Sequence, residues 1–236
     1  MEASSNDPGA ASPGPLPRSL AVPERAAAAS GAPTRFPLGR PARLAVFASG
    51  RGTNLQSLLH AFPAGHELAS VVLVVSNRPD ALALERARAA GVEAVHAPWP
   101  NRAAFEAAAN GLLADRGVDL VCLAGFMRLL SAGFTERWAG RLVNVHPSLL
   151  PAFPGLDAHG QAIAAGVKES GCTVHLVDAG VDSGPVILQR KVPVLPGDDA
   201  DTLAERVLAA EHEAYPAALR LLLTGAWRHD DRGENG

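Results

Sequence analysis

Short apolar runs alternate with segments of helical periodicity through the middle of the chain. An apolar run at 44–48 is followed by Leu55, Leu58, Leu59 and Phe62 at the spacing of one helix face. The alternation continues, and we expect strands at 71–75, 92–95 and 120–124 and helices at 81–90 and 102–114. Continuously apolar strands are typical of parallel sheets buried on both faces. The pattern predicts an α/β fold: a Rossmann-like, doubly wound, mainly parallel sheet with helices on both faces.

A polar pair interrupts the next apolar run, at 142–146. In an extended segment residues i and i+2 share a face, so Asn144 and His146 are expected to point the same way. Pro147 cannot continue a central strand, which places His146 at the carboxyl end, where open α/β sheets bind ligands. The alternative is that both side chains merely bond to loop backbone.

The last third of the chain changes character. Two extended segments, 172–177 and 186–194, are joined by a turn and predict a C-terminal antiparallel extension of the sheet. Residues 201–224 have the periodicity of a long closing helix, with Asp199 or Asp201 as its N-cap.

The two ends of the chain differ in composition from the residues between them. Residues 1–41 are rich in Pro, Ala, Gly and Ser, and predict a disordered tail. We expect one catalytic domain at 42–228 and a flexible C-terminus at 229–236.

Charge and composition narrow the class of partner. The formal net charge is -3 and no long basic run occurs, which argues against nucleic acid. The two cysteines have no CxxC spacing, and no apolar run of about 18 residues is present, so we expect a cytoplasmic protein without membrane contact. A small-molecule partner is the expectation that remains.

A glycine-containing loop, 49–54, joins the first strand to the first helix. Backbone N–H groups at a helix N-terminus form an anion site, and a monophosphate fits this loop. A dinucleotide fingerprint would need a third glycine where Leu55 stands, and the Gly-Lys-Ser/Thr of a Walker loop is absent. The alternative is a turn that binds nothing.

The turn 178–185 carries two carboxylates, Asp178 and Asp182. A carboxylate beside His146 would favour the imidazolium, and would itself be able to accept a proton directly or through water. The alternative for Asp182 is a simple Asx turn, which is common before Ser-Gly. Sequence spacing leaves both open.

Two other kinds of site are disfavoured. A metal site would have to use His146, His159, His175 and Asp182, which lack the i, i+4 histidine spacing of zinc enzymes, so we expect no metal. No Gly-x-Ser-x-Gly motif is present, which disfavours a serine nucleophile.

Taken in order, these segments resemble the phosphoribosylglycinamide formyltransferase family of folate-dependent enzymes. The matching motifs are 49–55 (SGRGTNL), 123–128 (LAGFMR), 144–151 (NVHPSLLP) with 153–155 (FPG), and 182–185 (DSGP). The resemblance runs from about Arg43 to Trp227.

The resemblance implies formyl transfer from 10-formyltetrahydrofolate, as cosubstrate, to the amine of glycinamide ribonucleotide. It implies three groups of residues: catalytic Asn144, His146 and Asp182; substrate-binding Gly52, Thr53, Asn54 and Glu211; and donor-binding Arg102, Met127, Arg128, Leu129, Leu130 and Asn144. Some family members carry His where Asp157 stands, so no role is assigned to Asp157 or His159. A monomer or a homodimer is expected.

Three rival readings remain. Methionyl-tRNA formyltransferase and formyltetrahydrofolate deformylase share the Asn-x-His and Asp pattern; the first would need a further C-terminal domain and the second an N-terminal regulatory domain, and we expect neither here. The phosphate loop also favours a ribonucleotide substrate. A non-catalytic nucleotide-binding module is the alternative from another class.

Overall fold

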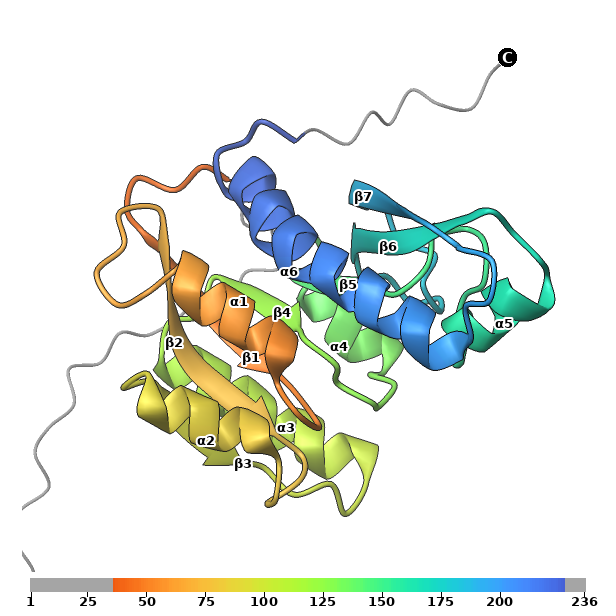
Figure 1. Cartoon of the computed structure of the whole chain (residues 1–236). Coiled ribbons are helices and arrows are strands. Elements are labelled where there is room, and N and C mark those ends of the chain that lie inside the picture. The colour runs from red at the N-terminus through yellow and green to blue at the C-terminus, as the bar shows by residue number, and fades with distance from the viewer. Residues whose placement is uncertain (1–35, 228–236) are drawn as a thin grey trace, which may run out of the picture. The chain divides into compact units, whose positions relative to one another are not determined.

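The computed structural model describes residues 36–227, which form a mixed sheet covered by helices on both faces (Figure 1). The seven strands lie in the order β3-β2-β1-β4-β5-β6-β7. Their bounds are β1 (Ala42–Phe47), β2 (Ala69–Ser76), β3 (Glu93–His96), β4 (Leu120–Leu123), β5 (Leu142–His146), β6 (Glu169–Leu176) and β7 (Val186–Pro193). The first five strands are parallel and the last two pairings are antiparallel. The predicted fold class is confirmed, including the antiparallel extension.

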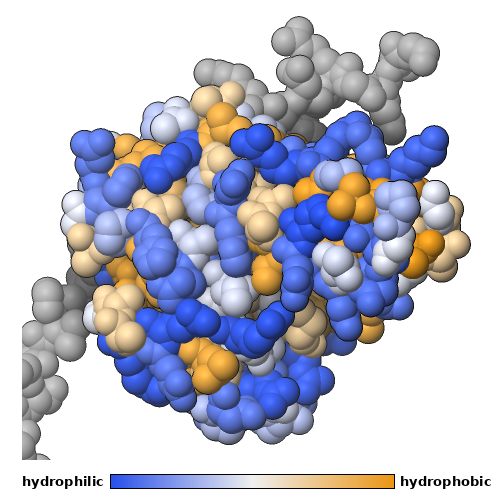
Figure 2. All heavy atoms as spheres, in the orientation of Figure 1, coloured by the Kyte–Doolittle hydropathy of each residue, from blue (hydrophilic) through white to orange (hydrophobic). Residues whose placement is uncertain are grey.

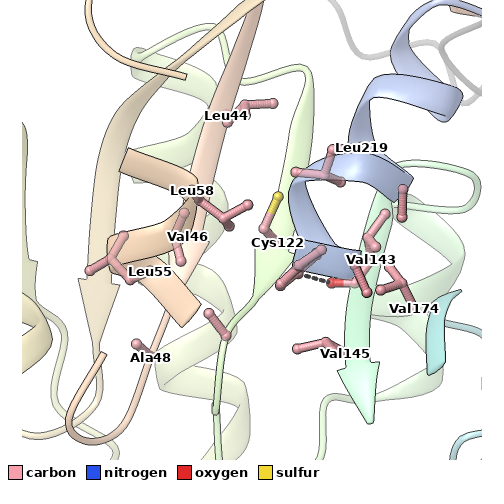
Figure 3. Packing of buried hydrophobic residues seen from close by; sticks show 14 of the residues in the cluster. Leu44, Val46, Ala48, Leu55, Leu58, Cys122, Val143, Val145, Val174 and Leu219 are labelled. Atoms are coloured by element: carbon pink, nitrogen blue, oxygen red, sulfur yellow. Dashed lines mark hydrogen bonds between the residues drawn. The ribbon is translucent and has the colours of Figure 1, made fainter. Parts of the chain in front are cut away.

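The helices divide between two hydrophobic clusters, one on each face of the sheet. Their bounds are α1 (Thr53–Ala61), α2 (Leu82–Ala89), α3 (Arg102–Asp115), α4 (Ala132–Arg137), α5 (Ala158–Ala164) and α6 (Ala200–Leu223). Helices α1, α2 and α6 pack on one face, and α3 and α4 pack on the other. Figure 3 shows the first cluster, where Val46 and Cys122 of the sheet lie near Leu58 of α1 and Leu219 of α6.

Successive side chains along a strand point to opposite faces of the sheet and so pack in opposite hydrophobic clusters. In β5, Val143 and Val145 enter the cluster under α1 and α6, while Leu142 enters the cluster under α3 and α4. Asn144 and His146 share the face of Leu142 because the side-chain period of a strand is two. The prediction that they point the same way is therefore confirmed.

Strand order places a topological switch point between β1 and β4. The chain leaves β1 for β2 on one side, and crosses back to β4 on the other side of β1. The loops that follow two such neighbouring strands diverge and leave a crevice at the carboxyl edge of the sheet. The glycine loop, the loop after β4 and the end of β5 all meet this edge.

The predicted tail lies mostly outside the described residues, as does the C-terminal segment from residue 228 onward. Residues 36–41 are described, and they are packed: Phe36 and Leu38 contact the core, and Arg40 pairs with Asp119 at 2.7 Å. Of these six residues, only Phe36 and Leu38 are partly buried and the other four are exposed.

The face of the molecule shown in Figure 2 is mainly hydrophilic, with small separate apolar groups. Within residues 36–227, no helix combines the length and the apolar character needed to cross a membrane. The most exposed large apolar side chains include Met127 and Leu129, which follow β4 at the carboxyl edge.

Candidate active site

The glycine loop turns tightly because Gly52 adopts a conformation that side chains disfavour. Gly52 is the N-cap of α1 with φ 70°, and a Cβ added there would lie 2.8 Å from Cα and Cβ of Ala83 in α2. Arg86 of α2 holds the loop by donating from Nε to the Arg51 carbonyl at 2.8 Å. No side chain caps α1, so the N–H groups of its first turn remain available to an anion.

Asn54 and Glu211 meet beneath this loop, although 157 positions separate them. Nδ2 of Asn54 donates to Oε2 of Glu211 at 2.6 Å, and Glu211 is only 7% exposed. Burial raises the pKa of Glu211 to about 7, although the Asn54 bond opposes the shift. Oδ1 of Asn54 is buried and has no partner among the described residues, which leaves an acceptor for a ligand's hydroxyl or N–H group.

Replacing Glu211 by Gln is expected to stabilise the fold at alkaline pH. The unfolded chain releases the Glu211 proton near 4.5 and the folded chain near 7, so wild-type stability falls as pH rises through this window. The loss is on the order of 3 kcal/mol, and glutamine does not titrate. Urea unfolding at pH 5 and pH 8 measures the difference. Glu213→Gln, an exposed position on the same helix, is the control; the same pH dependence in Glu211→Gln and wild type would contradict the assignment.

Asn144, His146 and Asp182 come together at the end of β5. Nδ1 of His146 lies 3.2 Å from Oδ2 of Asp182, and Nε2 of His146 lies 2.9 Å from the Phe153 carbonyl oxygen. Both neighbours are acceptors, and a neutral imidazole carries only one N–H, so the imidazolium is the form that satisfies both contacts. Sequence spacing could not decide whether a carboxylate of the turn 178–185 lies beside His146. In the structure Asp182 does.

Asp182 is held by strained backbone and by several donors. Its φ is 52°, an uncommon conformation outside glycine, and its Oδ2 accepts from the backbone N–H of Gly155 at 2.9 Å. Burial acts to raise the pKa of Asp182, but bonding from His175 and Gly155 and the charge of His146 outweigh it and lower the pKa. The carboxylate is thus ionised at neutral pH.

His175 joins this cluster and was considered in the sequence only as a possible metal ligand. It lies opposite Asn144 in the antiparallel register of β5 and β6. Its Nε2 is 3.3 Å from Nδ2 of Asn144 and 3.6 Å from Oδ1 of Asp182, while its Nδ1 bonds to the Leu176 carbonyl. The available signal was the alternation of Thr173 and His175 with apolar neighbours in β6.

The loop after β4 carries four of the expected donor-binding residues. Met127, Arg128 and Leu129 are exposed, and Leu130 is half-buried. The loop is tied to the glycine loop by Ser49, whose Oγ accepts from the Met127 N–H at 3.0 Å. Ser49 was not singled out in the sequence, although it begins the glycine motif. Arg102, also exposed, begins α3 on the opposite face from α1.

Asp157 and His159 lie in the segment that follows β5. Asp157 is the N-cap of α5 and accepts from the Gly160 N–H at 3.2 Å. Burial lowers the pKa of His159, although the negative charge of Asp157 opposes this shift. Nδ1 of His159 is buried without a partner in the described part of the chain. Between residues 36 and 227, no group of three or more His, Cys, Asp or Glu residues is arranged to hold a metal.

Comparison with known proteins places these features in context. The family model described as Formyl transferase matches residues 42–219. The Bacillus subtilis phosphoribosylglycinamide formyltransferase is 41% identical over 189 residues, which cover 77% of this chain and 94% of that protein. The solved structure of glycinamide ribonucleotide transformylase 1 from Symbiobacterium toebii has a TM-score of 0.78 and 50% identity, covering 83% of this chain and 93% of that one.

Much longer relatives also match. The trifunctional purine biosynthetic protein adenosine-3 of Drosophila pseudoobscura is 50% identical over 206 residues, which are 85% of this chain and 15% of that protein. The chain therefore spans a small part of these trifunctional relatives.

Proposed function

The chain belongs to the formyl transferase family, within it to the phosphoribosylglycinamide formyltransferases, and we propose that it transfers a formyl group from 10-formyltetrahydrofolate to the amine of glycinamide ribonucleotide. The products are formylglycinamide ribonucleotide and tetrahydrofolate, in the purine biosynthesis that the relatives' names indicate. The predicted family is confirmed, whereas the donor and the residue roles are our proposal.

The observation that carries this proposal is the Asn144, His146 and Asp182 group at the end of β5. The amine attacks the formyl carbon and a tetrahedral oxyanion forms. Asn144 and the imidazolium of His146 donate hydrogen bonds to this oxyanion, and such preorganised donors stabilise a developing charge strongly. Because Nε2 of His146 faces the Phe153 carbonyl, the developing oxyanion must share or replace that acceptor.

Asp182 has two tasks in this scheme. Its negative charge lies 3.2 Å from Nδ1 of His146 and stabilises the imidazolium, and the lowered pKa of Asp182 keeps the carboxylate ionised. It also accepts, through water, the proton that the attacking amine loses. The bond between the formyl carbon and N10 of the donor then breaks, and N10 takes up a proton to give tetrahydrofolate.

The ribonucleotide binds along the glycine loop. Gly52, Thr53 and Asn54 present the uncapped first turn of α1 to the 5′-phosphate. Glu211 and the free Oδ1 of Asn54 bond to the ribose or glycinamide part, which explains why a carboxyl with a raised pKa is kept buried there. The amine is thereby directed toward the carboxyl end of β5.

The donor lies against the loop after β4. Exposed Met127 and Leu129, with Leu130, give an apolar lining for the pterin, and Asn144 lies between this lining and the ribonucleotide. Arg128 and Arg102 carry positive charge on the side where the folate tail leaves the pterin. No metal takes part in this scheme.

A Gly52→Ala variant is expected to raise the KM for the ribonucleotide by about tenfold or more. Its Cβ would need the left-handed conformation and would press on Ala83 backbone, so the phosphate loop must shift. Steady-state kinetics with the ribonucleotide varied measure this. Gly50→Ala is the matched control, since a Cβ at Gly50 meets nothing within 4 Å. An unchanged KM in Gly52→Ala would show that the phosphate binds elsewhere.

The activity itself is tested by following tetrahydrofolate production from 10-formyltetrahydrofolate, with and without glycinamide ribonucleotide. Production that depends on the ribonucleotide supports the proposal. Production that does not require it would mean hydrolysis of the donor, as in a deformylase. No production in either condition would mean that the chain uses a different acceptor or is a non-catalytic binding module.

A further inference from the structure

Trp99 lies between the two segments that supply the proposed donor-binding arginines. It stands in the connection from β3 to α3, three positions before Arg102. Its ring is 4.8 Å from that of Phe105 and 6.0 Å from that of Phe126, in the loop after β4. The indole is therefore fixed by aromatic packing on two sides, although it is only partly buried.

The guanidinium of Arg128 lies over the Trp99 ring. Cζ of Arg128 lies 5.4 Å from the ring centroid, within the range of a cation–π contact. A guanidinium held over an aromatic face keeps its N–H groups at its edge, where they can still bond to a carboxylate. The indole thus orders Arg128 without occupying its hydrogen-bond donors.

In the described part of the chain, no carboxylate bonds to the Arg128 donors. Among residues 36–227, Arg128 forms no hydrogen bond or ion pair. Glu106, an acid in the first turns of α3, is already bonded to Ser131 through both of its oxygens, at 2.6 Å each. Arg102 likewise has no acidic partner in this part of the chain. Within residues 36–227, Arg128 is thus an exposed cation without an acidic partner, held against the Trp99 ring.

We propose that Trp99 is a positioning residue of the donor site, which holds Arg128 so that its guanidinium binds the carboxylates of the donor's glutamate tail. This inference rests on the proposed function, which places the pterin against residues 127–130. It assigns a role to a residue outside the motifs that identify the family. The donor's p-aminobenzoyl-glutamate end is the part that reaches beyond the pterin, and it carries the donor's negative charge.

The test compares two donors, 10-formyltetrahydrofolate and the same molecule without glutamate, 10-formyltetrahydropteroate. Trp99→Leu is expected to raise the KM for the glutamate-bearing donor about two- to fivefold, the range of an exposed cation–π contact. It should leave kcat, the KM for the ribonucleotide and the KM for the tail-less donor unchanged. Trp99→Phe, which keeps a ring in the packing, is expected to show a smaller rise.

Arg128→Met is expected to raise the KM for the glutamate-bearing donor about tenfold, the effect of a lost charged hydrogen bond. The double variant with Trp99→Leu should be no worse than Arg128→Met alone, because the indole acts through Arg128. Arg88→Met, an exposed arginine on α2, controls for loss of surface charge.

An equal rise in KM for both donors in Trp99→Leu and Trp99→Phe would overturn the inference, since it would mean a general disturbance of the pterin pocket. Additive effects in the double variant would also overturn it. If the wild-type protein transfers formyl from neither donor, the proposed function fails and this inference fails with it. Wild-type transfer with unaffected Trp99 variants refutes the inference alone.

Discussion

His146→Asn is expected to lower kcat by about 10²–10³-fold while the protein keeps its fold. The variant loses the charged donor at the end of β5, and loss of one such donor to an oxyanion typically has this effect. Asparagine is shorter, so it cannot contact both Asp182 and the position of the Phe153 carbonyl. Steady-state formyl transfer at saturating concentrations of both reactants measures the change, and circular dichroism melting shows whether the fold persists.

His96→Asn is the control for His146→Asn. His96 also ends a parallel strand at the carboxyl edge, but it is exposed and lies two strands away from the proposed phosphate loop. Its replacement should leave kcat unchanged. Wild-type turnover in folded His146→Asn would remove His146 from the mechanism and with it the proposed oxyanion site.

Much of the fold follows from local pattern. The continuous apolar runs predict buried parallel strands, and β4 and β5 end within a residue of their expected ends. Asn144 and His146 share a face because of strand periodicity alone. These features depend on neighbours in sequence, so a single sequence is enough to predict them.

Other features depend on contacts that sequence spacing does not encode. Helices α4 and α5 have only six and seven residues, too short for a periodic pattern to stand out. His175 reaches the cluster through the register of β5 with β6, and that register is set by the whole antiparallel pair. Glu211 meets Asn54 only because α6 returns across the sheet. For Glu211, the family resemblance pointed to the site while periodicity did not.

The pKa values of two carboxyls at this site are shifted in opposite directions, that of half-buried Asp182 and that of buried Glu211. Asp182 is surrounded by donors and its pKa is lowered, whereas Glu211 has one amide donor and its pKa is raised to about 7. The Asp182 carboxyl is therefore kept charged beside His146, as the proposed role of proton acceptor requires. The Glu211 carboxyl, with its pKa of about 7, is partly protonated at neutral pH and is available to bond to a polar ligand. Environment alone separates two otherwise similar groups.

Asp182→Asn is expected to lower kcat by about 10²–10³-fold or more, because one change removes two contributions. The amide has no negative charge to hold His146 as the imidazolium, so the charged oxyanion donor is lost. It also cannot accept the proton from the amine. The asparagine carboxamide does not ionise, so raising the pH should not restore the variant.

The same variant gives a second, independent measurement. A carboxylate with a lowered folded pKa contributes stability above its unfolded pKa of about 3.8, and this is lost as pH falls through the folded value. Asp182→Asn should lack that acid-dependent part of the wild-type unfolding curve. Asp178→Asn is the matched control: its Oδ1 accepts from Gly180 and Ser183 in the same turn, and asparagine keeps that acceptor. If Asp178→Asn were inactive and Asp182→Asn fully active, the carboxylate of this mechanism would be Asp178, and the 3.2 Å pairing of His146 would have no part in catalysis.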